Sequence, residues 1–312
     1  MVAALRAFGA REPDPAVRNP DALAERIISP AQLQLITEHP IARALLGDYP
    51  EGRRNPEVAG MSNMMLIRTR FIDDHLLHAL RNGATQVVIL GAGFDTRPYR
   101  FAELLTGKRV FEIDYQSTQE LKRRRLSEAG IPVPPNVSFV EVDFKRDMLR
   151  PAMSNAGYEP AERTFFIWEG VSMYLSESTV RHTLRTISSY SIPGTSLVMD
   201  FAERAMIDLF AKLPELSQHK YTTHWGEPWI FGLPDMGERD FFRGCGLELR
   251  EILSVVGSEA SKRYLTRSDG MSFGKVRGAP PDWRRMSTTM RAIWMFVTRR
   301  SRWYAVAKLD VR

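Results

Sequence analysis

Residues 86–100 read QVVILGAGFDTRPYR, and this stretch decides the fold. Five β-prone residues lead directly into a turn that contains Gly91 and Gly93, and the N-cap candidates Asp95 and Thr96 then favour the start of a helix. The sequence therefore predicts a buried strand, a glycine turn and a helix. Because glycine has no Cβ atom, a ligand can lie against the backbone of such a turn. A nucleotide-like cofactor binds to an open α/β sheet in this way.

The glycine pattern limits the kind of cofactor. A dinucleotide fingerprint has a third glycine, as G-x-G-x-x-G, and Thr96 stands at that position. The Gly-Lys-Ser/Thr signature of a phosphate-binding loop does not occur in the sequence. A turn with two glycines suits a ligand that has an adenosine but no pyrophosphate, and S-adenosylmethionine is such a ligand. A nicotinamide-dependent oxidoreductase is the alternative that Thr96 disfavours.

The bulk composition is that of an ordinary globular protein. The chain has 312 residues and 44% hydrophobic content, and we find neither a long linker nor a repeat, so we expect one domain with additions. Its apolar runs fall short of the roughly 18 residues of a membrane span. Arg6 and Arg11 interrupt the apolar start too early for a signal peptide. The single cysteine, Cys245, excludes an internal disulfide, and we expect no metal site and a cytoplasmic location.

Positive charge gathers at the end of the chain. Residues 275–312 hold ten Lys and Arg against two Asp, whereas the net charge of the whole chain is +6. Such a tail can meet nucleic acid, an anionic membrane or an acidic substrate, but it can equally be a solvated helix face, which we expect here. The stretch 286–304 could bind a membrane surface or form a homodimer, although packing on its own domain is favoured.

Strands and helices alternate through the middle of the chain. This alternation predicts an α/β fold with a parallel sheet that is covered on both faces. A helix is expected at 61–80, and two late strands at 246–256 and 302–310 suit an antiparallel closing strand. The other predicted strands are 86–90, 109–113, 138–142, 164–168 and 195–200, and further helices lie near 97–105, 116–128 and 176–189.

Three regions lie outside this alternation. The first 50 residues hold six prolines between short apolar stretches, so we expect residues 1–80 to form an N-terminal helical cover. Residues 201–240 mix aromatic and polar side chains with prolines, which suits an inserted helical lid. Residues 270–312 form the basic C-terminal segment with the closing strand.

Acidic residues follow three of the predicted strands. Asp114 lies about 20 residues after the glycine turn, where an acid binds ribose hydroxyls in many nucleotide-binding sheets, and it stands nearer the strand end than its competitor Glu112. Asp143 could accept a hydrogen bond from an adenine amino group. Glu169 follows a strongly apolar run and is costly to bury unpaired, so a ligand ammonium would satisfy it. Helix capping is the alternative role for Asp114 and Asp143.

Arg68 is predicted to lie on the buried face of its helix. Its neighbours three and four positions away are all apolar, namely Met64, Met65, Phe71 and Ile72. A buried guanidinium needs an anion, and the methionyl carboxylate of the cofactor is one candidate. A partner in the N-terminal segment is the other. Arg70, in contrast, has Asp73 and Asp74 at helical spacing and reads as a surface pair.

Taken together, five segments resemble the leucine carboxyl methyltransferase family of S-adenosylmethionine-dependent methyltransferases. Within it, the bacterial polyketide O-methyltransferases of the tetracenomycin carboxyl-methylating type are the closer likeness. The segments are IRTRFIDD at 67–74, VVILGAGFDTRPYR at 87–100, FEIDYQSTQELK at 111–122, FIWEGVSMYL at 166–175 and GEPWIFGLP at 226–234. The C-terminal forty residues depart from the usual short ending of the family.

The resemblance implies a class I methyltransferase, with a Rossmann-like sheet of about seven strands and helices on both faces. It implies S-adenosyl-L-methionine as cofactor and S-adenosyl-L-homocysteine as product. It implies that Arg68 holds the cofactor carboxylate and that Glu169 lies near the methionyl amine. The remaining cofactor-binding residues that it implies are Gly91, Gly93, Asp114, Asp143 and the backbone of Phe144.

The expected reaction is O-methylation of a small-molecule acceptor, with secondary metabolism as the setting. A carboxylate acceptor needs no general base, whereas a phenol or alcohol needs one, for which His219 and His224 are the candidates. Tyr174 could line the acceptor pocket. The lid aromatics (Tyr221, Trp225, Trp229 and Phe231) suit either an aromatic acceptor or ordinary packing. A protein or tRNA methyltransferase and a cofactor-binding module without catalysis stay open as alternatives.

Overall fold

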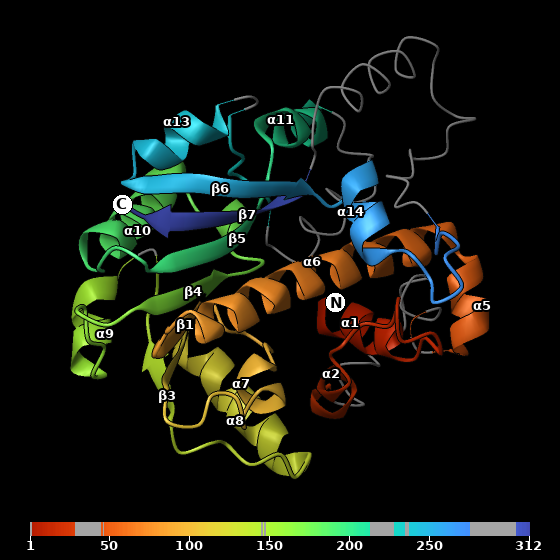
Figure 1. The fold of residues 1–312 in the computed structure, drawn as a ribbon, viewed down its shortest axis with the longest axis horizontal. Coiled ribbons are helices and arrows are strands. Elements are labelled where there is room, and N and C mark those ends of the chain that lie inside the picture. The colour runs from red at the N-terminus through yellow and green to blue at the C-terminus, as the bar shows by residue number, and fades with distance from the viewer. Residues whose placement is uncertain are drawn as a thin grey trace.

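The computed structural model describes residues 2–28, 45, 47–144, 146, 148–212, 228–234, 237–274 and 304–312. These residues contain a seven-stranded sheet in the order β3-β2-β1-β4-β5-β7-β6 (Figure 1). The strands are β1 (Gln86–Leu90), β2 (Arg109–Asp114), β3 (Val137–Glu141), β4 (Thr164–Trp168), β5 (Ser196–Ala202), β6 (Leu247–Ser254) and β7 (Tyr304–Val311). The predicted α/β fold with about seven strands is confirmed.

The first five strands are parallel, and β7 closes the sheet in the antiparallel sense. It lies between β5 and β6 and pairs antiparallel with both. The antiparallel closing strand expected from the sequence is therefore confirmed. Because the parallel strands end at one edge, the segments that follow β1, β2 and β4 meet there.

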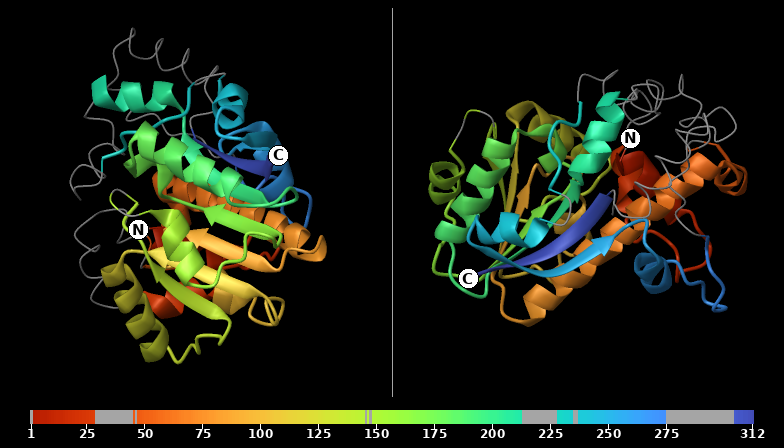
Figure 2. Two further views of the ribbon diagram at one scale, coloured as in Figure 1. Left: turned by 90° about the vertical axis from the view of Figure 1, so that its left-hand side faces the viewer. Right: turned by 90° about the horizontal axis from the view of Figure 1, so that it is seen from above.

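Both faces of the sheet are covered, and the packing of β4 explains the apolar run Phe165–Trp168 in its sequence. Phe165 and Ile167 pack in one core cluster with residues of α6 (Pro56–Arg81) and α14 (Ser258–Tyr264). Phe166 and Trp168 pack in the cluster on the opposite face. Figure 2 shows helices on both sides of the sheet. A parallel strand buried on both faces has no polar side to reveal its period, which explains the continuous hydrophobic run.

The helices agree with the predicted positions at most places. The remaining helices are α1 (Val2–Ala10), α2 (Leu23–Ile27), α5 (Tyr49–Arg54), α7 (Arg97–Arg100), α8 (Gln116–Glu128), α9 (Leu149–Asn155), α10 (Glu177–Ser189), α11 (Arg204–Lys212) and α13 (Glu238–Arg243), with the 3-10 turn η1 (Ser172–Tyr174). The helix that we expected at 61–80 begins earlier, at Pro56. Asn55 precedes it, and its Oδ1 accepts a hydrogen bond from the N–H of Val58, which is an N-cap with proline at the first position.

The additions to the sheet are described only in part. Residues 213–227, 235 and 236 of the predicted lid (201–240) and residues 275–303 of the basic segment (270–312) lie outside the described residues. Residues 228–234 run beside the end of β5, where the N–H of Leu233 donates to the carbonyl of Ala202. Within the part of the chain that is described, the helices are too short or too polar to cross a membrane.

Candidate functional site

The glycine turn follows β1 at the carboxyl edge of the sheet, and the surroundings of its two glycines differ. Both have positive φ, +65° at Gly91 and +43° at Gly93. A Cβ atom at Gly91 would lie 2.3 Å from Cγ2 of Val171, whereas one at Gly93 would meet nothing closer than 3.8 Å. At Gly91 a side chain of the protein therefore occupies the space that the missing Cβ atom leaves, whereas at Gly93 this space is open. That the two glycines bind a cofactor stays a prediction.

Replacing Gly91 by alanine is expected to lower the free energy of unfolding by roughly 2–4 kcal/mol, from the left-handed backbone and the clash together. Gly130→Ala is the matched control, because Gly130 has φ +62° and a Cβ atom added there would meet only open space. We expect the control to cost only about 1–2 kcal/mol. Equal losses for the two variants in urea unfolding would contradict the packing argument.

Asp114 ends β2 and contacts the glycine turn. One carboxylate oxygen accepts from the N–H of Gly93 at 2.5 Å, and the other accepts from the N–H of Tyr115 at 2.7 Å. Burial raises the pKa of Asp114 in spite of these two hydrogen bonds. Glu112, in contrast, is fully buried and pairs with Lys122 at 2.6 Å. Of the two acids on β2, Asp114 is therefore the one that lies next to the turn.

The segment after β3 places Asp143 and Phe144 at the same edge. The hydroxyl of Tyr115 donates to Asp143 at 3.0 Å, so the chain after β2 is tied to the chain after β3. Phe144 is half-buried and stacks near Trp168 at the end of β4, with 6.4 Å between ring centroids. The roles implied for Asp143 and Phe144 at an adenine site stay predictions.

Arg68 is buried, as predicted, but it already has partners in the protein. It is 2% exposed, and its Nε lies 2.8 Å from Glu169. Its Nη1 donates to Asp200 of β5 at 2.9 Å and to the hydroxyl of Tyr304 of β7 at 2.8 Å. The anions are thus neither in the N-terminal segment nor reserved for a ligand, since two carboxylates neutralise the guanidinium within the fold.

Glu169 already has two partners within the protein, and its predicted contact with a ligand ammonium stays a prediction. It contacts Arg68 and also Nη1 of Arg97, at 2.7 Å. Burial alone would raise the pKa of Glu169, but these two guanidinium groups outweigh it and hold the pKa well below the ordinary value. For Asp200, burial outweighs Arg68 and raises the pKa. Glu169 is therefore the firmly ionised member of the pair.

Arg97 is a central residue that sequence reasoning missed. It is 3% exposed and lies 2.7 Å from Asp73, 2.6 Å from Asp95 and 2.7 Å from Glu169. Asp95 accepts from the N–H of Arg97, while the hydroxyl of Thr96 donates to Asp21. Neither side chain is therefore a conventional N-cap. Of the three carboxylates that contact Arg97, only Asp95 lies near it in the sequence, which is why the local pattern did not reveal its role.

Other predicted positions have simpler environments. Arg70 is not a surface pair: its guanidinium donates to the carbonyls of Ala16, Pro15 and Arg18 and so holds the N-terminal segment. Tyr174 lies in η1 and packs partly buried against the core. Phe231 is buried in the core, so packing explains it. The base candidates His219 and His224, and the aromatics Tyr221 and Trp225, lie outside the described residues.

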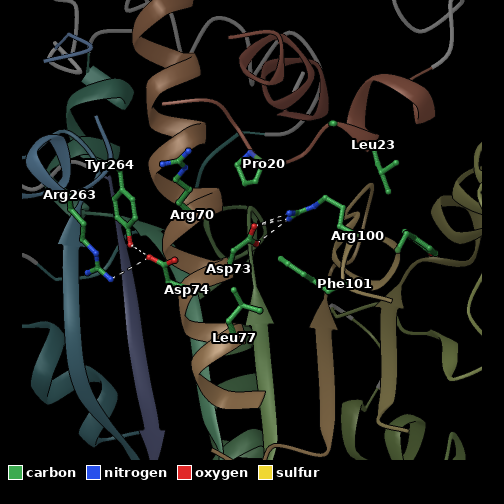
Figure 3. Close-up of a pocket in the computed structure, with 12 residues that line it drawn as sticks. Pro20, Leu23, Arg70, Asp73, Asp74, Leu77, Arg100, Phe101, Arg263 and Tyr264 are labelled. Carbon is green, nitrogen blue, oxygen red and sulfur yellow. Dashed lines mark hydrogen bonds and ion pairs between the residues drawn. The ribbon is translucent and has the colours of Figure 1, made fainter. Parts of the chain in front are cut away.

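A cavity of about 860 Å³ lies beside this network rather than at the glycine turn. Figure 3 shows that α6, α7, α14 and the segment around Pro20 and Leu23 surround it. Its acidic side chains are already paired, Asp73 with Arg100 at 2.9 Å and Asp74 with the hydroxyl of Tyr264 at 2.8 Å. The candidate site predicted from the sequence lies instead at the carboxyl edge of the sheet, where the glycine turn and the buried network meet, and Asp73 and Arg100 belong to both the network and the cavity lining.

Comparison with known proteins decides the family. The family model of leucine carboxyl methyltransferase matches residues 1–188, which is more than half of the chain. This chain belongs to the leucine carboxyl methyltransferase family. It is therefore an S-adenosylmethionine-dependent methyltransferase, with S-adenosyl-L-methionine as its cofactor.

Relatives agree with this family, and a solved structure shares the fold. A relative from Mycolicibacterium paratuberculosis is 30% identical over 264 residues, which cover 81% of this chain and 83% of the relative. One from Mycolicibacterium smegmatis is 34% identical over 206 residues, and the chain spans 66% of its length. Both are named provisionally as S-adenosyl-L-methionine-dependent methyltransferases. A DUF574 family protein from Streptomyces avermitilis shares the fold, with a TM-score of 0.52, 14% identity and coverage of 100% of this chain and 97% of its own.

The charges of the site fit the cofactor of this family. The network has three guanidinium groups against four carboxylates, namely Arg68, Arg97 and Arg100 against Asp73, Asp95, Glu169 and Asp200. With all seven ionised, one negative charge is in excess, and S-adenosylmethionine carries one net positive charge. Among the described residues, no group of His, Cys, Asp and Glu is arranged to hold a metal ion.

The guanidinium of Arg68 also keeps a donor that makes no hydrogen bond to the described residues. Nη1 donates to Asp200 and Tyr304, whereas the buried Nε lies 2.8 Å from Glu169 without a hydrogen bond. The buried carboxylates hold the other side of the group in a fixed orientation. Arg68 can therefore be neutralised within the fold and still offer hydrogen bonds to a carboxylate.

Proposed function

We propose that this chain is an O-methyltransferase that methylates a small-molecule acceptor of a polyketide-like or other secondary metabolite type, at a carboxylate in preference to a hydroxyl. The observation that carries the proposal is the excess negative charge of the network beside the open backbone at Gly93, at the carboxyl edge of the sheet. S-adenosylmethionine supplies a methyl group that is activated as a sulfonium, for in-line displacement by the acceptor.

We assign the cofactor contacts to the residues that surround this edge. Asp114 would hold the ribose, and its orientation is supported by the N–H groups of Gly93 and Tyr115. Arg68 would donate to the methionyl carboxylate, and Glu169 would accept from the methionyl amine. Because the pKa of Glu169 is lowered, it stays a carboxylate at neutral pH. Asp143 and the backbone of Phe144 would bind the adenine, as the family resemblance implies.

The preference for a carboxylate acceptor rests on its chemistry, since the base candidates His219 and His224 lie outside the described residues. His75 lies on α6 and pairs with Glu251 of β6, and His78 lies in the last turn of α6. His182 is exposed on α10. None of these histidines has a contact with the network, and a carboxylate, which is ionised at neutral pH, needs no base. Positioning and exclusion of water are then the main tasks of the protein.

The chain can be tested with methyl-labelled S-adenosylmethionine and a panel of polyketide-derived carboxylic acids, each matched with the corresponding phenol. We expect label in a product that releases methanol in alkali, because an ester is hydrolysed and an aryl ether is not. Asp114→Asn should reduce the turnover at low cofactor concentration, whereas Asp310→Asn, in an exposed pair with Arg250, should not. Transfer only to the phenols would remove the carboxylate preference. Transfer only to added protein or tRNA would overturn the small-molecule acceptor.

A further inference from the structure

Two buried side chains of the N-terminal segment contact the glycine turn directly. Arg6 of α1 donates from Nη2 to the carbonyl of Phe94 at 2.7 Å, and Phe94 is the residue that follows Gly93. Asp21 accepts from the hydroxyl of Thr96 at 2.6 Å. Phe94 and Thr96, in the second half of the turn, are thus held by residues that lie more than 70 positions away in the sequence.

The same two side chains are joined to each other. Nε of Arg6 lies 2.7 Å from the second carboxylate oxygen of Asp21, and the two residues are 6% and 1% exposed. Asp21 also accepts from the N–H of Ala24, at the start of α2. Arg6 is thus held at Nε by the ion pair and at Nη2 by a backbone carbonyl, so the side chains of Arg6 and Asp21 have little conformational freedom. We call Arg6 and Asp21 the latch.

Apolar packing supports the latch from the side of α2. Ile27 is fully buried in a cluster with Tyr99, Leu126 and Ile131, against which Phe94 and Leu23 also pack. The guanidinium of Arg26 donates to the carbonyl of Ala129 at 2.6 Å. The N-terminal segment is therefore docked on α7 and α8, the two helices that follow the glycine turn and Asp114.

We propose that the latch positions the cofactor turn, so that residues 2–28 are part of the cofactor site without lining it. This inference rests on the proposed assignment of the turn and Asp114 to the cofactor. The N–H of Gly93 donates to Asp114 on one side of the turn, and the carbonyl of Phe94 accepts from Arg6 on the other. Loss of the latch lets the turn relax away from the geometry that presents Gly93 and Asp114 together.

The latch and the cofactor must then be coupled in both directions. A cofactor that binds better to the latched turn also holds the N-terminal segment in place. We therefore expect S-adenosylhomocysteine to slow the cleavage of the N-terminal segment by trypsin at Arg11, Arg18 or Arg26. A latch that only stabilises the fold would not give ligand-dependent protection confined to these sites.

The direct test is calorimetric titration of S-adenosylhomocysteine into Arg6→Met, Asp21→Asn and Thr96→Val, at a temperature well below unfolding. Arg11→Met is the matched control, because Arg11 forms an exposed ion pair with Glu25 in the same segment. We expect the dissociation constant to rise by about tenfold or more in Arg6→Met and Asp21→Asn, within the usual range of coupling between sites. It should rise less in Thr96→Val and stay unchanged in Arg11→Met.

The outcomes separate the latch from the site itself. If the unaltered chain does not bind S-adenosylhomocysteine, the proposed function fails. If it binds, and the folded latch variants bind with unchanged affinity, the latch proposal is overturned while the site stands. Should Arg6→Met not fold, Thr96→Val decides, since it removes one hydroxyl and leaves the ion pair between Arg6 and Asp21 intact. Unchanged affinity and unchanged trypsin protection in Thr96→Val would then contradict the proposal.

Discussion

Replacing Arg68 by alanine is expected to lower the free energy of unfolding by about 3–5 kcal/mol and to abolish measurable binding of S-adenosylhomocysteine. The guanidinium is 2% exposed and lies between Glu169 and Asp200. Its removal leaves two buried carboxylates with a single neutralising neighbour, Arg97, which contacts only Glu169 of the two. Denaturant unfolding measures the first effect and calorimetric titration the second.

Arg70→Ala is the matched control, two positions away on the same helix. Arg70 donates to three backbone carbonyls of the N-terminal segment and leaves no buried carboxylate behind when it is lost. We expect a smaller loss of stability and binding that is reduced far less. Arg68→Lys separates charge from geometry, because lysine keeps the positive charge but cannot reach Glu169 and Asp200 with a planar fork. Equal affinity in Arg68→Ala and Arg70→Ala would refute the assignment of Arg68 to the cofactor.

Replacing Lys122 by methionine is also expected to lower the free energy of unfolding by about 3–5 kcal/mol. Lys122 is 1% exposed and Glu112 is fully buried, and their charged groups lie 2.6 Å apart. Without the ammonium, Glu112 keeps only the hydroxyl of Tyr99, which donates to it at 2.9 Å. Unfolding curves of the variant give the loss directly.

The loss in Lys122→Met should depend on pH in a defined direction. Burial already raises the pKa of Glu112 above its ordinary value of 4.5, and removing Lys122 raises it further. A carboxyl with a raised pKa in the fold contributes stability below its unfolded pKa and loses it as pH rises through the folded pKa. We therefore expect the variant to be closer to the original protein at pH 5 than at pH 8. The double variant Glu112→Gln, Lys122→Met should recover part of the stability, and no recovery would contradict the pairing.

These predictions depend on features that differ in how far the sequence could reveal them. The sequence was sufficient for β1 and β4, because a parallel strand buried on both faces must be a short apolar run with breakers at its ends. It was also sufficient for the burial of Arg68, since the apolar neighbours at helical spacing are local in the chain. The preference for Asp114 over Glu112 followed from their order along one strand, which decides which acid lies at the carboxyl end.

What only the tertiary structure decided is which groups meet. Arg68 contacts Asp200, 132 positions later, and Tyr304, 236 positions later, and no periodicity relates such distant residues. The demand for glycine at position 91 comes from Val171 on another loop, and Arg97 gains its carboxylates from three separate segments. Local sequence determines the elements and which face of each is buried, because propensity and amphipathic spacing act within a few residues. The pairing of buried charges depends on the sheet order and on loop closure, which are properties of the whole chain.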